Sequence, residues 1–330
     1  MIGVAVLVSA LTRQGPSLGA LAFQQLYHSK QVECLLISRY TTLQKNRLIG
    51  DVKLTSTYLK MWLTLNFGNS LSRVVSFDLK ADLVNILSKG RSIIYIRANN
   101  KENYTDTFGR IAGLLLFEFH KLILYRAYIV FALSETMKEE YRGNIAIYDK
   151  IQVLPNFIDQ QSDLNLTKTK NSFLIVASLI PRKRVIETVE CFIAEFCNKS
   201  EVTLTVIGDG VLKSSLENII DQGVYMFKLE YISESIDPSA YFASHAYFIL
   251  MSKSEGISRS SLEAANSGCK LLLSSIDVHK EYFSETALLL DDFEDLRIAL
   301  RDCYDGKVTV NPAFPLVCSQ SFIWSKLEKL

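Results

Sequence analysis

Residues 254–264, SEGISRSSLEA, decide the fold of this chain. An apolar run of strand length, 246–251, precedes them, and a helical pattern begins within them. Gly256 allows the backbone to turn tightly and to approach a ligand closely. Ser258 or Ser260 can cap the helix, whose free N–H groups and positive dipole end suit a phosphate or sugar hydroxyl groups. The segment therefore predicts a strand–loop–helix unit that holds a ligand at its loop.

Two glutamates, Glu255 and Glu263, lie on either side of this helix start. Glu263 falls about a turn and a half inside the helix, at roughly 3.6 residues per turn. A carboxylate there can accept two hydrogen bonds from the vicinal hydroxyls of a ribose, as acidic residues do in dinucleotide folds. Glu255 lies in the loop, nearer to a reacting sugar. The alternative is that both acids only cap the helix and interact favourably with its dipole.

Outward from this unit, short apolar runs alternate with amphipathic segments along the whole chain, which predicts parallel sheets covered by helices on both faces. The strands expected in the first half are 2–8, 33–38, 72–77, 92–97, 128–133 and 151–154, and the helices are 17–29, 78–89, 109–125 and 135–142. The strands expected in the second half are 173–177, 202–207, 224–229, 246–251, 270–274 and 286–290, and the helices are 184–197, 211–221, 258–267 and 292–304.

The polar stretch 156–171 interrupts this alternation and is typical of a linker. The fold class that we predict is α/β, with two Rossmann-like domains facing each other across a cleft, where small ligands usually bind. The first domain is expected over 1–160 and the second over 161–310. A C-terminal helix within 311–330 is expected to return toward the first domain.

Five further motifs accompany the pair of glutamates. They are LPNFID at 154–159, VASLIPRK at 176–183, VIGDG at 206–210, SKSEG at 252–256 and EAANSGCK at 263–270. In this order they resemble the motifs of retaining glycosyltransferase family 4, which has the GT-B fold and whose hallmark is two glutamates separated by seven residues. The resemblance covers most of residues 150–290, and it implies transfer of a sugar from a nucleotide-sugar donor, held by the second domain, to an acceptor glycan.

The resemblance also implies a role for each matching residue at the donor phosphates. Lys183, together with Arg182, would neutralise the diphosphate. Ser178 departs from the family pattern, because many members have an arginine there, so the second charge would come from Arg182 or Arg184. Three cations at a helix N-terminus oppose the helix dipole unless an anion is present, which favours phosphate binding over a merely solvated helix start.

The remaining donor contacts follow from the same resemblance. Gly208 and Gly210 would let the backbone pass close to the nucleotide. Glu263 would hold the ribose, and Glu255, the candidate catalytic residue, would lie at the transferring sugar. The backbone N–H groups expected to hold sugar hydroxyls or phosphate are those of Gly256, Ile257 and Ser258.

The first half carries weaker signals. Gly15 and Pro16 lie in a loop after the first strand, which in the family lies against the donor phosphates or the acceptor. The segment 96–113 is similar to one in bacterial members that build surface polysaccharides. Arg97 ends a buried strand, where an arginine is more often a ligand contact than a core residue, and we expect it at the cleft. Asn99 is expected at the same cleft, or only in a turn.

Composition and charge limit the partners. The chain has 330 residues, of which 48% are hydrophobic and 22% charged, as in ordinary globular proteins. Residues 1–160 hold 19 Lys and Arg against 12 Asp and Glu, a net charge of +7, whereas residues 161–330 hold 17 against 23, a net charge of −6. A basic first half suits an anionic membrane surface or a phosphate-bearing acceptor, although drift in surface composition is an alternative.

Metal-dependent sugar transfer commonly uses a D-x-D pair, and this sequence contains none. It also contains six cysteines without a C-x-x-C pair, so we expect no metal and no cofactor, the nucleotide sugar being a co-substrate. We expect no nucleic acid partner. His120, on a predicted helix, is expected to be a packing residue.

The setting expected for such an enzyme is the cytoplasm, peripheral at the inner face of a bacterial plasma membrane. There it would assemble O-antigen of lipopolysaccharide, or capsular polysaccharide, on a glycan carried by a polyprenyl diphosphate lipid. Two alternatives remain open. One is a nucleotide-sugar epimerase of GT-B fold, and the other is a non-catalytic partner that only binds nucleotide sugar.

Overall fold

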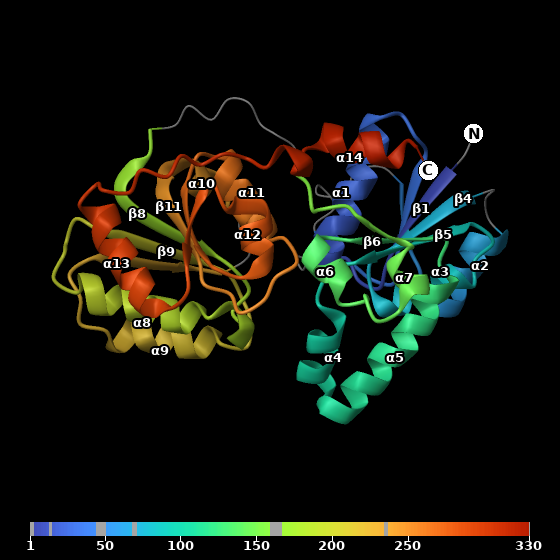
Figure 1. Ribbon diagram of the computed structural model, residues 1–330, viewed down its shortest axis with the longest axis horizontal. Helices are drawn as coiled ribbons and strands as arrows, with labels where there is room; N and C mark the ends of the chain where they lie inside the picture. Colours follow the sequence, from blue (N-terminus) through green and yellow to red (C-terminus); the bar gives the residue numbers. More distant parts are fainter. Residues whose placement is uncertain are drawn as a thin grey trace. The chain divides into compact units, whose positions relative to one another are not determined.

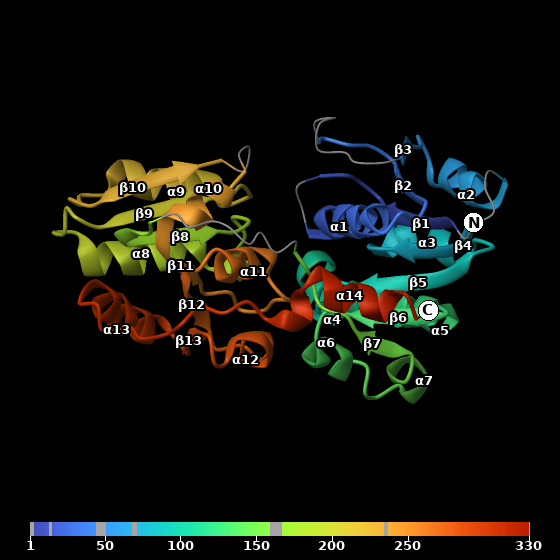
Figure 2. The same ribbon diagram turned by 90° about the horizontal axis from the view of Figure 1, so that it is seen from above.

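The computed structural model describes residues 3–12, 15–43, 51–67, 71–158, 167–233 and 237–329. The chain divides into two compact units, which we call the first and the second domain (Figures 1 and 2). The first domain comprises Met1–Asn156 and Ile323–Leu330, and the second comprises Phe157–Phe322. Much of the predicted linker, 159–166, lies outside the described residues.

The first domain is built on a parallel sheet of order β3-β2-β1-β4-β5-β6-β7. Its strands are β1 Gly3–Val8, β2 Cys34–Ser38, β3 Asp51–Leu54, β4 Leu71–Ser76, β5 Arg91–Ile96, β6 Ile129–Ala132 and β7 Ile151–Val153. Its helices are α1 Gly15–Ser29, α2 Tyr58–Phe67, α3 Leu79–Ile86, α4 Asn100–Phe108, α5 Arg110–Arg126, α6 Glu135–Glu139 and α7 Ile145–Tyr148. The last helix, α14 Gln320–Leu327, places Trp324 against Tyr27 of α1, with ring centroids 5.7 Å apart.

The second domain has a parallel sheet of order β10-β9-β8-β11-β12-β13. Its strands are β8 Thr169–Val176, β9 Thr203–Ile207, β10 Lys228–Ile232, β11 His245–Leu250, β12 Lys270–Ser274 and β13 Ala287–Leu290. Its helices are α8 Val185–Phe196, α9 Lys213–Gln222, α10 Ser239–Ser244, α11 Arg259–Asn266, α12 Asp277–Phe283 and α13 Phe293–Tyr304, with a short 3₁₀ turn at Pro181–Lys183. The predicted fold class, two parallel α/β domains, is confirmed.

The strand order reverses at β1 in the first domain and at β8 in the second, because each of these strands lies between two others that continue in opposite directions. In open parallel sheets, ligands bind beyond the carboxyl ends of the strands at such a reversal. In the second domain this point is the boundary between β8 and β11, which pair in parallel. A ligand site in the second domain is therefore expected at the loops that follow β8 and β11.

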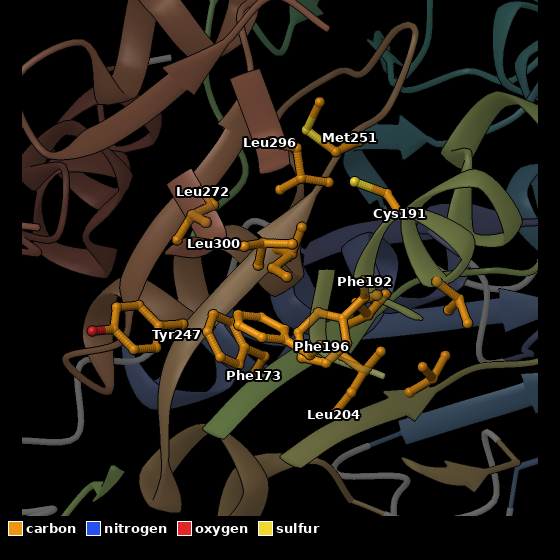
Figure 3. Close-up of a cluster of buried hydrophobic side chains, with 14 of the residues drawn as sticks. Phe173, Cys191, Phe192, Phe196, Leu204, Tyr247, Met251, Leu272, Leu296 and Leu300 are labelled. Atoms are coloured by element: carbon orange, nitrogen blue, oxygen red, sulfur yellow. The ribbon is translucent and has the colours of Figure 1, made fainter. Parts of the chain in front are cut away.

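An aromatic core anchors the second domain (Figure 3). Phe173 of β8 stacks on Tyr247 of β11 with ring centroids 4.8 Å apart, and Phe192 of α8 meets Phe173 edge-on at 5.1 Å. Phe196, one turn further along α8, joins the same cluster. Because α8 is amphipathic with this face inward, the core fixes the helix whose N-terminus follows the cationic turn at Pro181–Lys183.

The predicted strand at 224–229 is wrong, since β10 is Lys228–Ile232. Tyr225 stacks on Phe227 at 4.6 Å, and Phe227 packs edge-on against Phe192 at 5.2 Å. These apolar residues fill the core before the strand begins, whereas β10 itself is a half-exposed edge strand without a continuous apolar run. The sequence patterns also missed β3, an exposed edge strand, and the helices α2, α4, α7, α10 and α12.

Candidate functional site

The loops that follow β8 and β11 are joined by hydrogen bonds. The backbone N–H of Lys253 donates to the carbonyl of Arg182, with N···O 2.9 Å. The guanidinium of Arg182 in turn donates to the carbonyl of Ser254. These bonds hold a cationic turn against the glutamate-bearing loop at the reversal of strand order.

Lys183 and Arg182 converge on Glu255. The ammonium group of Lys183 donates to Oε1 of Glu255, and Nη1 of Arg182 lies 3.7 Å from Oε2. Only 7% of the Glu255 side chain is exposed. Burial by itself raises the pKa of this carboxyl, but the charges of Lys183 and Arg182 outweigh it and hold the pKa below its ordinary value. The site is therefore a buried carboxylate, ionised at neutral pH, with two cations on it.

Arg184 does not join this cluster. Its backbone is in the left-handed region, with φ 51°, where it separates the 3₁₀ turn from α8. Its guanidinium lies over the ring of Phe293 at 4.2 Å, and its Nε is 4.0 Å from Oε1 of Glu187. The second charge near Glu255 is thus that of Arg182.

The start of α11 carries the second glutamate of the pair. Ser258 is the N-cap, since its Oγ accepts from the N–H of Ser261 at 3.4 Å, and it also bonds to Oγ of Ser260 at 2.8 Å. Glu263 accepts from Nε of Arg259 at 2.8 Å, one turn earlier on the same helix. Ser258 therefore provides the cap, while the two glutamates form separate ion pairs, one between loops and one within α11.

The loop between β11 and α11 contains the other predicted donor contacts. Gly256 is half-buried, and the side chain of Ile257 is buried. They follow Glu255 directly and precede the cap at Ser258. Their backbone thus lies between the cation-bound carboxylate and the helix start.

Backbone packing by itself explains why positions 208 and 210 are glycines. A Cβ on Gly208 would lie 1.9 Å from the carbonyl oxygen of Ala177, and one on Gly210 would lie 2.4 Å from that of Leu179. The N–H of Leu179 donates to the carbonyl of Asp209 at 2.8 Å, so the turn after β9 packs directly on the loop after β8. Close packing of two backbones requires both glycines, whether or not a nucleotide approaches them.

In the first domain, Arg97 follows β5 and is half-buried. Its Nη2 donates to Oδ1 of Asn156 at 2.8 Å, and its guanidinium lies over the rings of Tyr95 and Phe77 at 5.5 and 5.7 Å. A Cβ on Gly19 would lie 2.0 Å from Nη1 of Arg97, so the glycine makes room for the guanidinium. Arg97 therefore braces α1 and the end of this domain in addition to any contact with a ligand.

The remaining predicted residues of the first domain serve helix starts. Gly15 and Pro16 begin α1, while residues 13–14 of the same loop lie outside the described residues. Asn99 caps α4, accepting from the N–H of Glu102 at 3.0 Å. Sequence reasoning missed Ser17, whose Oγ donates to the carbonyl of Ala10 at 2.6 Å and accepts from the backbone N–H of Thr12 at 3.0 Å.

A buried polar chain runs through the first domain at His120. Its Nε2 lies 3.2 Å from Oδ2 of Asp82, and its Nδ1 lies 2.9 Å from the hydroxyl of Tyr104. Ser76 donates to the other oxygen of Asp82 at 2.6 Å. Burial raises the pKa of Asp82 in spite of the hydrogen bond from His120. His120 is a satisfied internal histidine, as expected, but its partners are too distant in sequence to be read from a local pattern.

Two properties of the described residues concern metal ions and membranes. No group of three or more His, Cys, Asp and Glu among them could hold a metal ion. Within the same residues, no helix has both the length and the apolar character needed to cross a bilayer.

One family model matches part of the second domain. Residues 170–305 match the model of the family described as Glycosyl transferases group 1. No curated protein matches the sequence. This segment is therefore similar to the group 1 glycosyltransferases.

Solved structures extend the similarity to the whole chain. HepE from Anabaena, crystallised with UDP and glucose, is 13% identical with a TM-score of 0.80, over 100% of this chain and 99% of HepE. A mutant of TarM from S. aureus, in complex with Fondaparinux, alpha-GlcNAc-glycerol and UDP, is 10% identical with a TM-score of 0.73, over 100% and 99%. WaaB, a lipopolysaccharide outer core galactosyltransferase, is 14% identical with a TM-score of 0.66, over 100% and 98%. The chain has the fold of the GT-B glycosyltransferases.

Proposed function

We propose that this protein is a glycosyltransferase that moves a sugar from a nucleotide-sugar donor to an acceptor glycan. The observation that carries the proposal is the convergence of Lys183 and Arg182 on the buried carboxylate of Glu255, at the reversal of strand order in a domain similar to the group 1 glycosyltransferases. That arrangement supplies the two things a diphosphate-linked sugar needs, which are cations for the leaving group and an acid at the sugar.

Binding of the donor would replace the ion pairs of this cluster with contacts to the donor. When a diphosphate enters, Lys183 and Arg182 turn from Glu255 to the phosphate oxygens, because phosphate binds cations strongly. Glu255 is then released toward the hydroxyl groups of the transferring sugar. Glu263 has a half-exposed side chain on α11 and would exchange its bond to Arg259 for the ribose hydroxyls. The N–H groups of residues 256–258 complete the donor site.

Transfer would retain the configuration of the sugar. The donor phosphate receives the proton of the acceptor hydroxyl as the bond between the sugar and the diphosphate breaks and the new glycosidic bond forms. The enzyme supplies orientation and stabilises the negative charge that develops on the diphosphate. Lys183 and Arg182 perform that stabilisation, so no metal ion is required in this proposal.

The proposed acceptor is a glycan on a polyprenyl diphosphate lipid, during assembly of O-antigen or capsular polysaccharide at the cytoplasmic face of the membrane. The net charge of +7 in residues 1–160 supports an anionic acceptor or surface for the first domain. Gly15, Pro16, Arg97 and Asn99 are the residues proposed near the acceptor. Because HepE and TarM were crystallised with UDP, UDP-sugars are the first donors to test.

The test compares two adjacent cations by calorimetry with UDP and GDP. Lys183→Gln should raise the dissociation constant by about tenfold to a hundredfold, since a hydrogen bond to a charged group is worth about 1.5–3 kcal/mol. Arg184→Gln, the matched control, removes an equal charge one residue away and should change binding less than about twofold, within the spread expected of a surface charge. Binding of the nucleoside uridine should be unchanged in both variants.

Equal binding of both diphosphates by the parent and Lys183→Gln would show that the donor site is misplaced. Incubation with UDP-, GDP-, ADP- and CMP-sugars then separates the alternatives. Turnover of a nucleotide sugar without any acceptor would favour an epimerase. Tight donor binding with neither transfer nor slow hydrolysis would favour a non-catalytic partner.

A further inference from the structure

The outer face of α5 is mostly apolar, with Glu118 as the one acidic residue on it. Ile111, Leu115, Phe119, Leu122 and Tyr125 are between 45% and 80% exposed. They recur every three or four residues, so they form one stripe along the helix, which we call the α5 stripe. At about 1.5 Å per residue, the α5 stripe is about 20 Å long. Figure 1 shows α5 paired with α4 as a helical hairpin at the edge of the first domain.

The inner face of α5 is already occupied, so the α5 stripe cannot turn inward. Phe117, His120 and Leu124 are buried there, and His120 bonds to Asp82 and Tyr104 in the polar chain described above. A Cβ on Gly113 would lie 2.5 Å from the backbone of Thr105, so α4 packs closely on a third side. Two faces of α5 are thus fixed by contacts within the first domain, and the exposed apolar face is a constant feature of the fold.

Positive charge accompanies the α5 stripe. The helix carries Arg110, Lys121 and Arg126 but only one acid, Glu118, which pairs with Lys121 at 2.7 Å. Arg110 and Arg126 lie at the two ends and are exposed. The surface therefore combines an apolar stripe, interrupted near its middle by the Glu118–Lys121 ion pair, with exposed arginines at both ends.

Two aromatic rings extend this pattern at the C-terminal end of α5. The ammonium group of Lys150 lies 5.0 Å from the ring of Tyr125, and the guanidinium of Arg91 lies 4.9 Å from the ring of Tyr128. Both tyrosines are more than half exposed. Tyrosine and cations together suit the boundary between water and lipid headgroups, where one end of the ring is apolar and the other is hydrated.

An ordinary solvent-exposed helix of the same chain looks different. The outer face of α13 carries Glu294, Arg297 and Arg301, and the two arginines form ion pairs with Glu294 and with Glu195 of α8. Single exposed apolar residues are normal on a protein surface, but a continuous stripe marks an interaction site. The α5 stripe therefore needs a partner that accepts apolar side chains and cations together.

Charge decides between the two simplest partners, a second copy of this chain and a lipid surface. If two copies joined through their α5 stripes in either direction, Arg110 and Arg126 of one copy would lie opposite arginines of the other. The single Glu118 of each copy is already paired with Lys121. An anionic bilayer instead offers negative headgroups to the cations and an acyl layer to the stripe.

We propose that the α5 stripe docks the first domain on an anionic lipid bilayer. Ile111, Leu115 and Leu122 enter the boundary between headgroups and acyl chains, and Arg110 and Arg126 contact the headgroups. This deepens the membrane setting of the proposed function by naming the surface responsible. Its test needs no sugar transfer, so failure of one proposal leaves the other standing.

The test is flotation of the full-length protein with vesicles of phosphatidylcholine containing about one third phosphatidylglycerol. The parent should float with these vesicles. The triple variant Ile111→Ser, Leu115→Ser, Leu122→Ser should lose at least about tenfold in vesicle affinity, because it removes the apolar contacts without changing charge. The matched control is the triple variant Val211→Ser, Val224→Ser, Met226→Ser, in the second domain, whose side chains are 63% to 92% exposed and which should float like the parent.

A charge variant supplies the second measurement. Arg110→Gln with Arg126→Gln should reduce binding to the anionic vesicles by roughly tenfold and leave the weak binding to pure phosphatidylcholine unchanged. Circular dichroism and thermal unfolding establish that each variant is folded. The proposal is overturned if the parent does not float, or if the stripe variant floats as well as the parent. It is also overturned if sedimentation velocity shows a parent dimer that the stripe variant dissociates while neither protein binds vesicles.

Discussion

The first six strands of each domain follow the same order in the sheet, but buried carboxyl groups in the two domains have opposite pKa shifts. In the second domain, Lys183 and Arg182 hold the pKa of Glu255 below its ordinary value in spite of burial. In the first domain, burial dominates, raising the pKa of Asp82 and bringing that of Glu140 to about 7. The same sheet topology therefore supports either a charged site or a polar interior, and the side chains beyond the strand ends decide which.

The largest expected effect concerns the charged site. Glu255→Gln keeps the shape of the side chain but removes the charge that holds Lys183 and Arg182. Under the proposed function, the rate of sugar transfer should fall by about a hundredfold to a thousandfold, as when a preorganised electrostatic group is lost. Glu187→Gln, on the exposed side of α8, is the control and should leave the rate unchanged. Transfer by Glu255→Gln at the parent rate would remove Glu255 from the mechanism.

A second comparison uses the same substitution in both domains. Gly208→Ala places a methyl group against the backbone oxygen of Ala177, so it should lower the free energy of unfolding by about 3 kcal/mol. Gly19→Ala meets only the flexible end of Arg97, and alanine favours the helix, so its cost should be about 1 kcal/mol or less. Thermal and denaturant unfolding measure both. Equal losses of stability in the two variants would mean that the backbone of the turn after β9 moves to accommodate a methyl group as easily as the side chain of Arg97 does.

The pH dependence of stability should differ in sign between the two domains. The unfolded chain releases the Glu140 proton near 4.5, whereas the folded protein keeps it to about 7. Stability from this group is therefore present below pH 4.5 and declines as pH rises toward 7. Glu140→Gln should abolish this decline. Between acid pH and pH above 7, the free energy of unfolding of the parent should lose about 2 kcal/mol that the variant does not lose, a figure reduced for the partial exposure of Glu140.

Glu255 should act in the opposite direction. Its folded pKa is depressed, so its contribution is present above the ordinary value of 4.5 and is lost as pH falls below it. Glu255→Gln should thus flatten the stability profile only on the acid side. Unfolding measured between about pH 3 and 8, a range set by the ordinary carboxyl values, separates the two variants. If both variants flatten the stability profile in the same pH range, the pKa values of Glu140 and Glu255 are not shifted in opposite directions.

The smallest expected effect compares the two helix caps. Asn99→Ala and Ser258→Ala each remove one capping hydrogen bond and should each cost about 1 kcal/mol of stability. Only Ser258→Ala should also weaken donor binding, by a few-fold, because it loosens the start of α11 beside the ligand loop. Calorimetry with UDP measures this. A matching loss in Asn99→Ala would assign that residue to the donor instead of to helix α4 alone.

Much of the architecture was predictable from local pattern. β11 and the second half of β8 are apolar runs, and α8 has a clear inward face, so their type follows from sequence. Edge elements were not predictable in the same way. β3 has no buried residue, and Tyr225 and Phe227, just before β10, pack on the core beside α8. The periodicity of apolar residues reflects burial. Prediction of strands and helices from it therefore fails where an element is half-exposed or where a loop contributes residues to the core.

The sequence by itself determined the alternation of central strands and helices, the loop and helix start that bear Glu255 and Glu263, and the presence of three successive cations. It could not determine which of those cations would meet Glu255, 72 residues away in the chain. Only the tertiary structure decided that, because the parallel pairing of β8 with β11 brings the two loops together and the left-handed backbone of Arg184 places its side chain over Phe293. Local patterns are set by neighbouring residues, whereas the partners of a charge are set by strand crossings that no short segment contains.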